Sequence, residues 1–169
     1  MRGKHIVLVG LMGSGKTSIG KRVAQSLGLP FIDSDEALER RTGRTAREIL
    51  ADQGTDALHA AEADVVEDAL DSKTRSVIGA AASSVLTPAT RDRLRQEYVV
   101  WLRADPRRLI ERMASSDNDQ RPYVDRDPDV LIRQNEERKD LYQEIASLVV
   151  DSTRGDKDEL AEEIVAHVT

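Results

Sequence analysis

The stretch GLMGSGKTS, from Gly10 to Ser18, places three glycines, a lysine and several hydroxyl residues directly after the apolar run HIVLVG. It matches the pattern G-x-x-x-x-G-K-[ST], which joins a strand to a helix in proteins that bind nucleoside triphosphates. Glycines let successive backbone N–H groups turn toward a phosphate, and the N-terminus of the following helix adds partial positive charge. We expect Lys16 to contact the outer phosphates and the Thr17 hydroxyl to bind Mg²⁺. The residues predicted to hold ATP here are Gly10, Met12, Gly13, Ser14, Gly15, Lys16, Thr17 and Ser18.

Two carboxylates follow the next apolar run, in FIDSDEALE. Their spacing predicts that Asp33 and Asp35 project on the same side at the C-terminal end of a strand, the edge where open α/β sheets bind ligands. One of the two carboxylates could hold Mg²⁺ through water, and the other could accept a proton from an attacking hydroxyl. Alternatively, Asp35 could simply cap a helix that begins at Glu36. The sequence Asn-Lys-x-Asp, typical of guanine recognition, does not occur, which argues against a GTPase.

Strands and helices alternate along the whole chain and would position these groups. The β-branched runs HIVLVG, PFID, SVIGAA, YVVWLRA and SLVVD predict five buried strands. Between them lie helices whose ends are marked by Gly28 and by capping residues at Thr45, Asp105 and Asp127. Alternation of this kind predicts an α/β fold, with a parallel sheet of about five strands covered by helices on both faces. We expect one domain over residues 1–169, with the polar segment 115–128 as a mobile lid.

Composition excludes several classes of protein. The 169 residues carry a net charge of −6, with basic and acidic residues interleaved, which argues against a nucleic-acid partner. No apolar run is long enough to span a bilayer, so no membrane partner is expected. The chain has no cysteine, and therefore neither a disulfide nor a thiolate metal site. We expect a cytoplasmic monomer that acts on a small molecule.

These motifs, in this order, resemble those of the shikimate kinase family over nearly the full length of the chain. GLMGSGKTSIGKRVAQSLG is similar to the phosphate loop and first helix of that family, and FIDSDEALERRTGRTAREIL to its Asp-x-Asp segment. EADVVEDAL is similar to the helix after its substrate-binding arginine, QRPYV to the Arg-Pro of its lid, and EERKDLY to its Arg-x-x-x-Tyr segment. Adenylate kinase and gluconate kinase share the fold, but IDSDEALERRTGR fits them less well.

The resemblance implies a three-layer P-loop kinase fold and ATP-dependent, Mg²⁺-dependent phosphorylation of the 3-hydroxyl of shikimate or of a closely related cyclic polyol or hydroxy acid. It implies that Lys16, Asp35 and Arg121 are catalytic, with Arg121 in the lid neutralising charge on the transferred group. Arg112 would lie near the adenine. Thr17 and Asp33 would support the metal. On the acceptor side the residues implied are Asp35, His59, Ala81, Ala82 and Arg138, of which Arg138 would grip the substrate carboxylate.

The chain departs from the family pattern only on the acceptor side. His59 stands where the family has a second arginine for the substrate carboxylate, and an imidazole does not offer the bidentate fork of a guanidinium. Where the family has Ser-Leu-Gly-Gly-Gly, this chain reads GAAAS, which places Ala81, Ala82 and Ser83 on the glycine triad. Three alternatives therefore stay open: a kinase for another acceptor such as gluconate or a cyclitol, a non-catalytic nucleotide-binding relative, and a nucleoside-monophosphate kinase.

Overall fold

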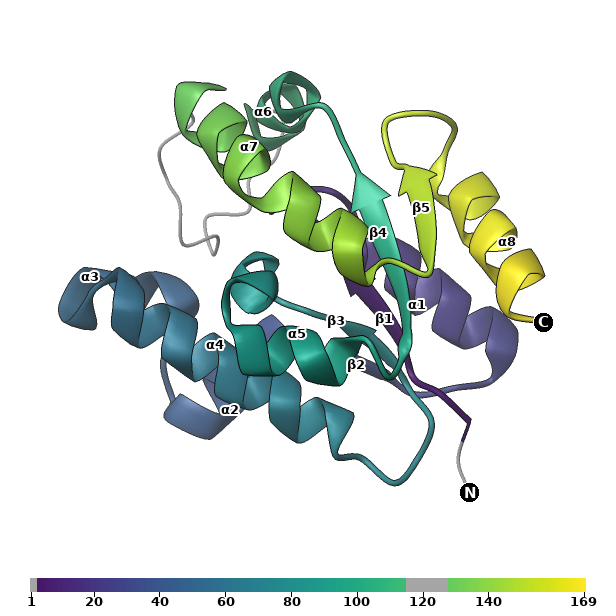
Figure 1. Ribbon diagram of the computed structural model, residues 1–169, viewed down its shortest axis with the longest axis horizontal. Helices are drawn as coiled ribbons and strands as arrows, with labels where there is room; N and C mark the ends of the chain where they lie inside the picture. The colour runs from purple at the N-terminus through teal and green to yellow at the C-terminus, as the bar shows by residue number, and fades with distance from the viewer. Residues whose placement is uncertain (1–2, 115–127) are drawn as a thin grey trace.

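The computed structural model describes residues 3–114 and 128–169. Within them a parallel sheet has the strand order β2-β3-β1-β4-β5 (Figure 1). This arrangement confirms the predicted parallel sheet, with each strand on one of the five apolar runs. The strands are β1 (Ile6–Val9), β2 (Phe31–Asp33), β3 (Val77–Gly79), β4 (Tyr98–Arg103) and β5 (Leu148–Asp151).

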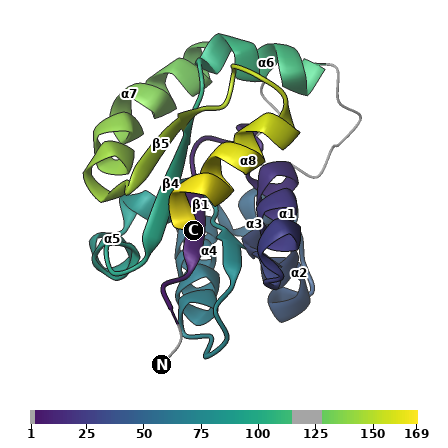
Figure 2. The same ribbon diagram turned by 90° about the vertical axis from the view of Figure 1, so that its right-hand side faces the viewer.

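Helices cover both faces of the sheet, as Figures 1 and 2 show. On one face lie α1 (Lys16–Leu27) and α8 (Lys157–Val168); on the other lie α4 (Thr55–Leu70), α5 (Pro88–Leu94), α6 (Pro106–Ala114) and α7 (Pro128–Ile145). The helices α2 (Ser34–Thr42) and α3 (Ala46–Gln53) pack against α4. None of the helices in the described ranges is long and apolar enough to cross a membrane.

Strand β1 shows how the sheet joins the two layers. Ile6 and Leu8 contribute to the core beneath α1 and α8, whereas Val7 and Val9 contribute to the core on the opposite face. All four side chains are buried because β1 is central and covered on both sides. A continuous apolar run is therefore required there, in place of the apolar–polar alternation of a half-exposed strand.

The predicted helix ends are confirmed where the structure describes them. Gly28 ends α1 in the left-handed conformation, with φ 65°, and Thr45 opens α3 with a complete capping box. Asp105 accepts a hydrogen bond from the backbone N–H of Arg107 at the start of α6. The cap predicted at Asp127 lies outside the described residues. The short 3₁₀ helix η1 (Ala82–Leu86) and α5 after it were not predicted, because segments of five and seven residues are too short to show an amphipathic repeat.

Helix α1 packs closely on the sheet at Gly20, and this packing positions the site. A Cβ added to Gly20 would lie 2.4 Å from Phe31 Cε1 and 3.0 Å from Leu8 Cδ1. A larger residue there would require the Phe31 side chain or the helix to shift. The close approach brings the first turn of α1 beside the end of β2, so that Thr17 and Asp33 meet.

Candidate active site

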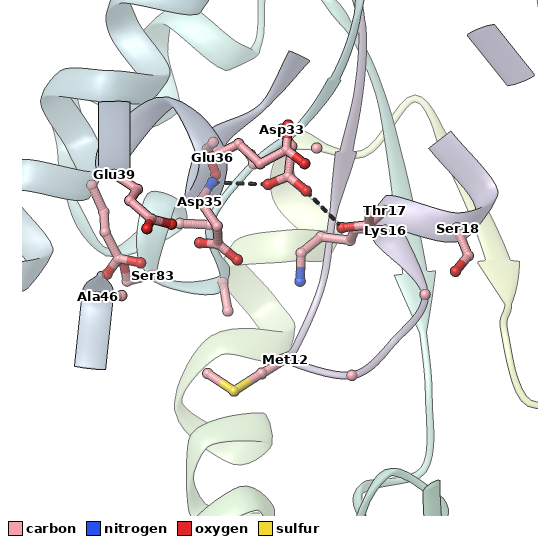
Figure 3. A pocket seen from close by; sticks show the side chains of 18 of the residues that line it. Met12, Lys16, Thr17, Ser18, Asp33, Asp35, Glu36, Glu39, Ala46 and Ser83 are labelled. Carbon is pink, nitrogen blue, oxygen red and sulfur yellow. Dashed lines mark hydrogen bonds between the residues drawn. The ribbon is translucent and has the colours of Figure 1, made fainter. Parts of the chain in front are cut away.

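A cavity of about 770 Å³ opens at the C-terminal ends of β1, β2 and β3 (Figure 3). It is the ligand-binding edge expected of an open parallel sheet. Of the predicted site residues, those that line it are Met12, Gly13, Gly15, Lys16, Thr17, Ser18, Asp33, Asp35, Ala81, Ala82, Arg112 and Arg138.

The phosphate loop closes on itself around the lysine. Lys16 Nζ donates to the carbonyl oxygens of Gly10 at 2.9 Å and Leu11 at 3.0 Å. Gly10, Gly13 and Gly15 have φ values of 148°, 84° and 103°, which side chains rarely tolerate. The loop carries no carboxylate, and its last glycine leads directly into the N-terminus of α1. Its backbone and lysine therefore fit a polyphosphate.

Two predicted loop residues do not line the cavity. A Cβ on Gly10 would lie 2.7 Å from the Leu102 carbonyl oxygen, so this glycine lets the loop sit tightly against β4. Ser14 is buried, and its hydroxyl has no hydrogen-bond partner among the described residues. Gly10 and Ser14 therefore contribute to the conformation of the loop rather than to the lining of the cavity.

The two predicted carboxylates lie on different elements. Asp33 is the last residue of β2 and caps α2, accepting a hydrogen bond from the Asp35 backbone N–H. Asp35 belongs to the first turn of α2, so two interpretations made from the sequence were wrong: Asp35 does not extend the strand, and it does not cap a helix at Glu36. The reason is that Asp33 itself ends the strand, and α2 begins at Ser34. Both carboxylates nevertheless face the cavity.

Thr17 and Asp33 form an oxygen pair suited to Mg²⁺. Thr17 Oγ1 donates to Asp33 Oδ2 at 3.0 Å, and Figure 3 marks this hydrogen bond with a dashed line. Mg²⁺ takes few protein ligands and completes its shell with water and phosphate oxygens. The described residues contain no group of three or more His, Cys, Asp or Glu that could hold a metal ion.

The charges of Lys16 and Asp35 face a common space (Figure 3). Burial lowers the pKa of Lys16 to about 8, although the nearby carboxylates of Asp35 and Asp33 oppose that change. The Asp35 carboxylate is open to the cavity, but the protein around it removes part of its hydration and raises its pKa, with the negative charge of Asp33 adding to the rise. A raised pKa improves a carboxylate as a base for a hydroxyl proton.

Arg138 contributes a buried positive charge to the cavity lining. Only 4% of it is exposed, and its Nε has no hydrogen-bond partner among the described residues. It lies within hydrogen-bonding reach of the Tyr142 hydroxyl, which donates to the Ala82 carbonyl at 2.7 Å. A buried guanidinium that faces a cavity in this way is suited to an anionic group.

His59 does not line the cavity. It is half-buried on α4, one turn before Glu62. Burial lowers the pKa of its imidazole, and the charge of Arg138 lowers it further. The imidazole is therefore near Arg138 but mainly uncharged at neutral pH.

Sequence reasoning missed Glu62 and Ser83 as a pair. Glu62 lies on the buried face of α4, and Ser83 Oγ donates to its Oε1 at 3.0 Å inside the cavity. Burial raises the pKa of Glu62 to about 7. A signal was present, because Glu62 lies four residues after Leu58 and four before Val66 and so interrupts an apolar stripe.

Two further cations, Arg112 and Lys157, line the cavity. Arg112 Nη2 donates to the Ser152 carbonyl at 2.8 Å, which fixes the side chain predicted to lie near the adenine. Lys157 Nζ donates to Ser18 Oγ at 3.1 Å. Lys157 was missed because only the packing of α8 on α1 brings residues so distant in sequence together. Arg121, and almost all of the predicted lid, lie outside the described residues.

Comparisons with known proteins identify the family of this chain. A family model described as "Shikimate kinase" matches residues 12–169. The shikimate kinase of Enterococcus faecalis is 32% identical over 164 residues, which cover 96% of either chain, and that of Symbiobacterium thermophilum is 40% identical over 130 residues, which cover 76% of this chain and 74% of that one. Among solved structures, the shikimate kinase of Acinetobacter baumannii in complex with shikimate has a TM-score of 0.89 at 27% identity and covers 98% of this chain and 93% of that one. The fold, the phosphate loop and these relatives agree, and the chain belongs to the shikimate kinase family.

Proposed function

We propose that the protein transfers the γ-phosphoryl group of ATP to the 3-hydroxyl of shikimate, giving shikimate 3-phosphate and ADP. The observation that carries the proposal is the placement of Lys16 and Asp35 around one cavity, with the Thr17–Asp33 pair beside them. Lys16 is suited to bind phosphate, Asp35 to bind the acceptor hydroxyl, and the Thr17–Asp33 pair to bind a metal ion. Family membership supports the acceptor assignment.

Each residue has a distinct task in this reaction. The loop amides and Lys16 would bind and orient the phosphates, and Thr17 and Asp33 would hold Mg²⁺, whose charge would offset that of the phosphates. Asp35 orients the acceptor hydroxyl and takes its proton as the new P–O bond forms. Arg138 binds the acceptor carboxylate, and Arg121 would act from the lid. Placing the two reactants in line supplies most of the rate enhancement in phosphoryl transfer.

Shikimate-dependent release of ADP in a coupled assay tests the reaction. Lys16→Ala should abolish turnover, and Asp35→Asn should lower kcat by about 10²–10⁴-fold while changing the shikimate KM little, because the carboxylate acts as a base. Asp52→Asn is the matched control: Asp52 pairs with Arg44 on the surface of α3, away from the cavity, and its replacement should leave kcat unchanged. Near-wild-type turnover by the Asp35→Asn variant would remove that residue from the chemistry.

A second candidate keeps the chemistry and changes the acceptor. The cavity lining includes one arginine on the acceptor side, together with Ala81, Ala82 and Ser83, and His59 lies outside it. This arrangement would favour a cyclic hydroxy acid or polyol whose carboxylate is placed differently or is lacking. Turnover of such a compound, with none at saturating shikimate, would establish the second candidate. Binding of ATP without turnover of any acceptor in the panel would instead indicate a non-catalytic protein.

A further inference from the structure

The Ser83–Glu62 hydrogen bond lies beside the guanidinium that would bind the acceptor. Glu62 is 7% exposed, Ser83 is 6% exposed, and both line the cavity together with Arg138. The Ser83 hydroxyl donates to Glu62 Oε1 at 3.0 Å. Glu62 and Arg138 are close enough for the positive charge to act on the carboxylate. Yet no ion pair joins Glu62 to Arg138 in the described part of the chain.

That separation is unexpected for two buried, opposite charges. Arg138 keeps an Nε without a hydrogen-bond partner among the described residues, and a buried carboxylate would normally rotate to satisfy it. Glu62 instead turns toward the neutral hydroxyl of Ser83. The other charges that act on Glu62 are Asp35 from α2 and Lys16 from α1, and His59 lies one turn away on its own helix. None of these holds the carboxylate by a hydrogen bond in the described residues, so Ser83 is its anchor.

We propose that Ser83 is a positioning residue, which holds the Glu62 carboxylate apart from Arg138 and so keeps the guanidinium available to the carboxylate of the acceptor. The inference rests on the proposed function for the identity of the acceptor, but not for the side-chain arrangement itself. If the hydroxyl is removed, Glu62 turns to Arg138 and competes with the acceptor from inside the protein. An internal competitor weakens acceptor binding without affecting the nucleotide or the chemical step.

Ser83→Ala tests the idea because it removes one hydroxyl and keeps the Cβ. The KM for shikimate should rise about tenfold, because the acceptor carboxylate would lose a charged hydrogen bond to Arg138. The values of kcat and of the KM for ATP should stay within about twofold. Ser83→Thr retains the hydroxyl and should restore wild-type affinity. Ser84→Ala is the matched control, since Ser84 is the next residue, is also buried, and donates to the Ala81 carbonyl and not to Glu62.

Repeating the Ser83→Ala substitution in a Glu62→Gln variant shows whether Ser83 acts by positioning Glu62 or through the packing of its loop. Glu62→Gln has no charge with which to compete for Arg138, so adding Ser83→Ala to Glu62→Gln should change the shikimate KM by less than about twofold. If Ser83→Ala costs the same tenfold in both backgrounds, or if Ser84→Ala weakens binding equally, Ser83 acts through the shape of the loop and the proposal is wrong.

A measurement without any acceptor distinguishes this inference from the proposed function. The Glu62 carboxyl carbon can be followed by NMR during a pH titration of the wild-type and Ser83→Ala proteins. The hydrogen bond from Ser83 lowers the pKa of Glu62, so its loss alone would raise that pKa. Formation of a contact with Arg138 would instead lower the pKa. A lower pKa in Ser83→Ala supports the proposal even if shikimate is not the acceptor, and a higher pKa overturns it even if shikimate is.

Discussion

Thr17 and Asp33 join the phosphate loop to the sheet: the Thr17 hydroxyl donates to Asp33 Oδ2 at 3.0 Å. The other oxygen of the same carboxylate, Oδ1, accepts the backbone N–H of Asp35 at 2.9 Å and caps α2. One side chain therefore faces the proposed metal position and fixes the start of the helix that carries the proposed base. Metal binding requires the negative charge of Asp33, whereas capping of α2 requires only an oxygen that accepts a hydrogen bond.

Substitution of Asp33 should separate those tasks. Asparagine caps helices about as well as aspartate, so Asp33→Asn should change the free energy of unfolding by less than about 0.5 kcal/mol. The Mg²⁺ concentration for half-maximal rate should rise at least about tenfold, because the neutral amide is a poor ligand for a hard cation. Asp33→Ala should show the same metal defect and also lose about 1 kcal/mol of stability with the cap. Urea denaturation and Mg²⁺ titrations of the two variants check this. An equal loss of stability in both would mean that the charge holds α2.

The lowered pKa of Lys16 predicts an alkaline limit on nucleotide capture. With a pKa of about 8 in the ligand-free protein, the ammonium loses its proton as the pH rises through that value, and with it the attraction for the phosphates. The quantity kcat/KM for ATP should therefore fall about tenfold per pH unit above pH 8 or so. The corresponding fall in kcat should occur at higher pH, because the bound phosphates stabilise the charged form of Lys16. A Lys16→Met protein has no such group, so its weak binding of a fluorescent ATP analogue should not vary over this pH range.

Short-range signals in the sequence predicted most of the framework. The glycine spacing of the phosphate loop, the capping box at Thr45 and the apolar run of β1 each depend on neighbouring residues, and each is confirmed. The pairs Ser83–Glu62 and Lys157–Ser18 were not predicted, because they form only when elements far apart in sequence pack together. The boundary between β2 and α2 was misplaced for a different reason. A carboxylate at the end of a strand can belong to the strand and cap the next helix at once.

Glu62 should make the stability of the protein depend on pH in a defined direction. Burial raises its pKa from 4.5 to about 7, so the folded protein holds this proton more tightly than the unfolded chain. Its contribution to stability is complete below pH 4.5 and is lost as the pH rises through about 7. Glu62→Gln cannot ionise and should gain stability relative to wild type between those values, by up to roughly 3 kcal/mol. Urea denaturation at pH 5 and pH 8 measures the difference.

Another variant on α4 controls for the general effect of pH on stability. Asp64 is exposed on the same helix, so Asp64→Asn should show no such change between pH 5 and pH 8. Were the stability of Glu62→Gln to follow that of wild type at both pH values, the Glu62 carboxylate would have to be ionised in the folded protein throughout this range.

His59 offers the most direct test of how the acceptor side differs from the family pattern. Its imidazole is near enough to Arg138 for the guanidinium to help lower its pKa, so at neutral pH it adds little positive charge. His59→Arg would place a second guanidinium beside Arg138, and the shikimate KM should fall about tenfold because one more charged hydrogen bond is made. Ala60→Arg adds the same charge at the next, exposed position of α4 and should leave the KM within about twofold. If both variants lower the KM alike, the gain comes from general attraction of an anion. If neither does, position 59 does not reach the acceptor, and the altered wall at Ala81 and Ala82 must account for any difference in acceptor affinity.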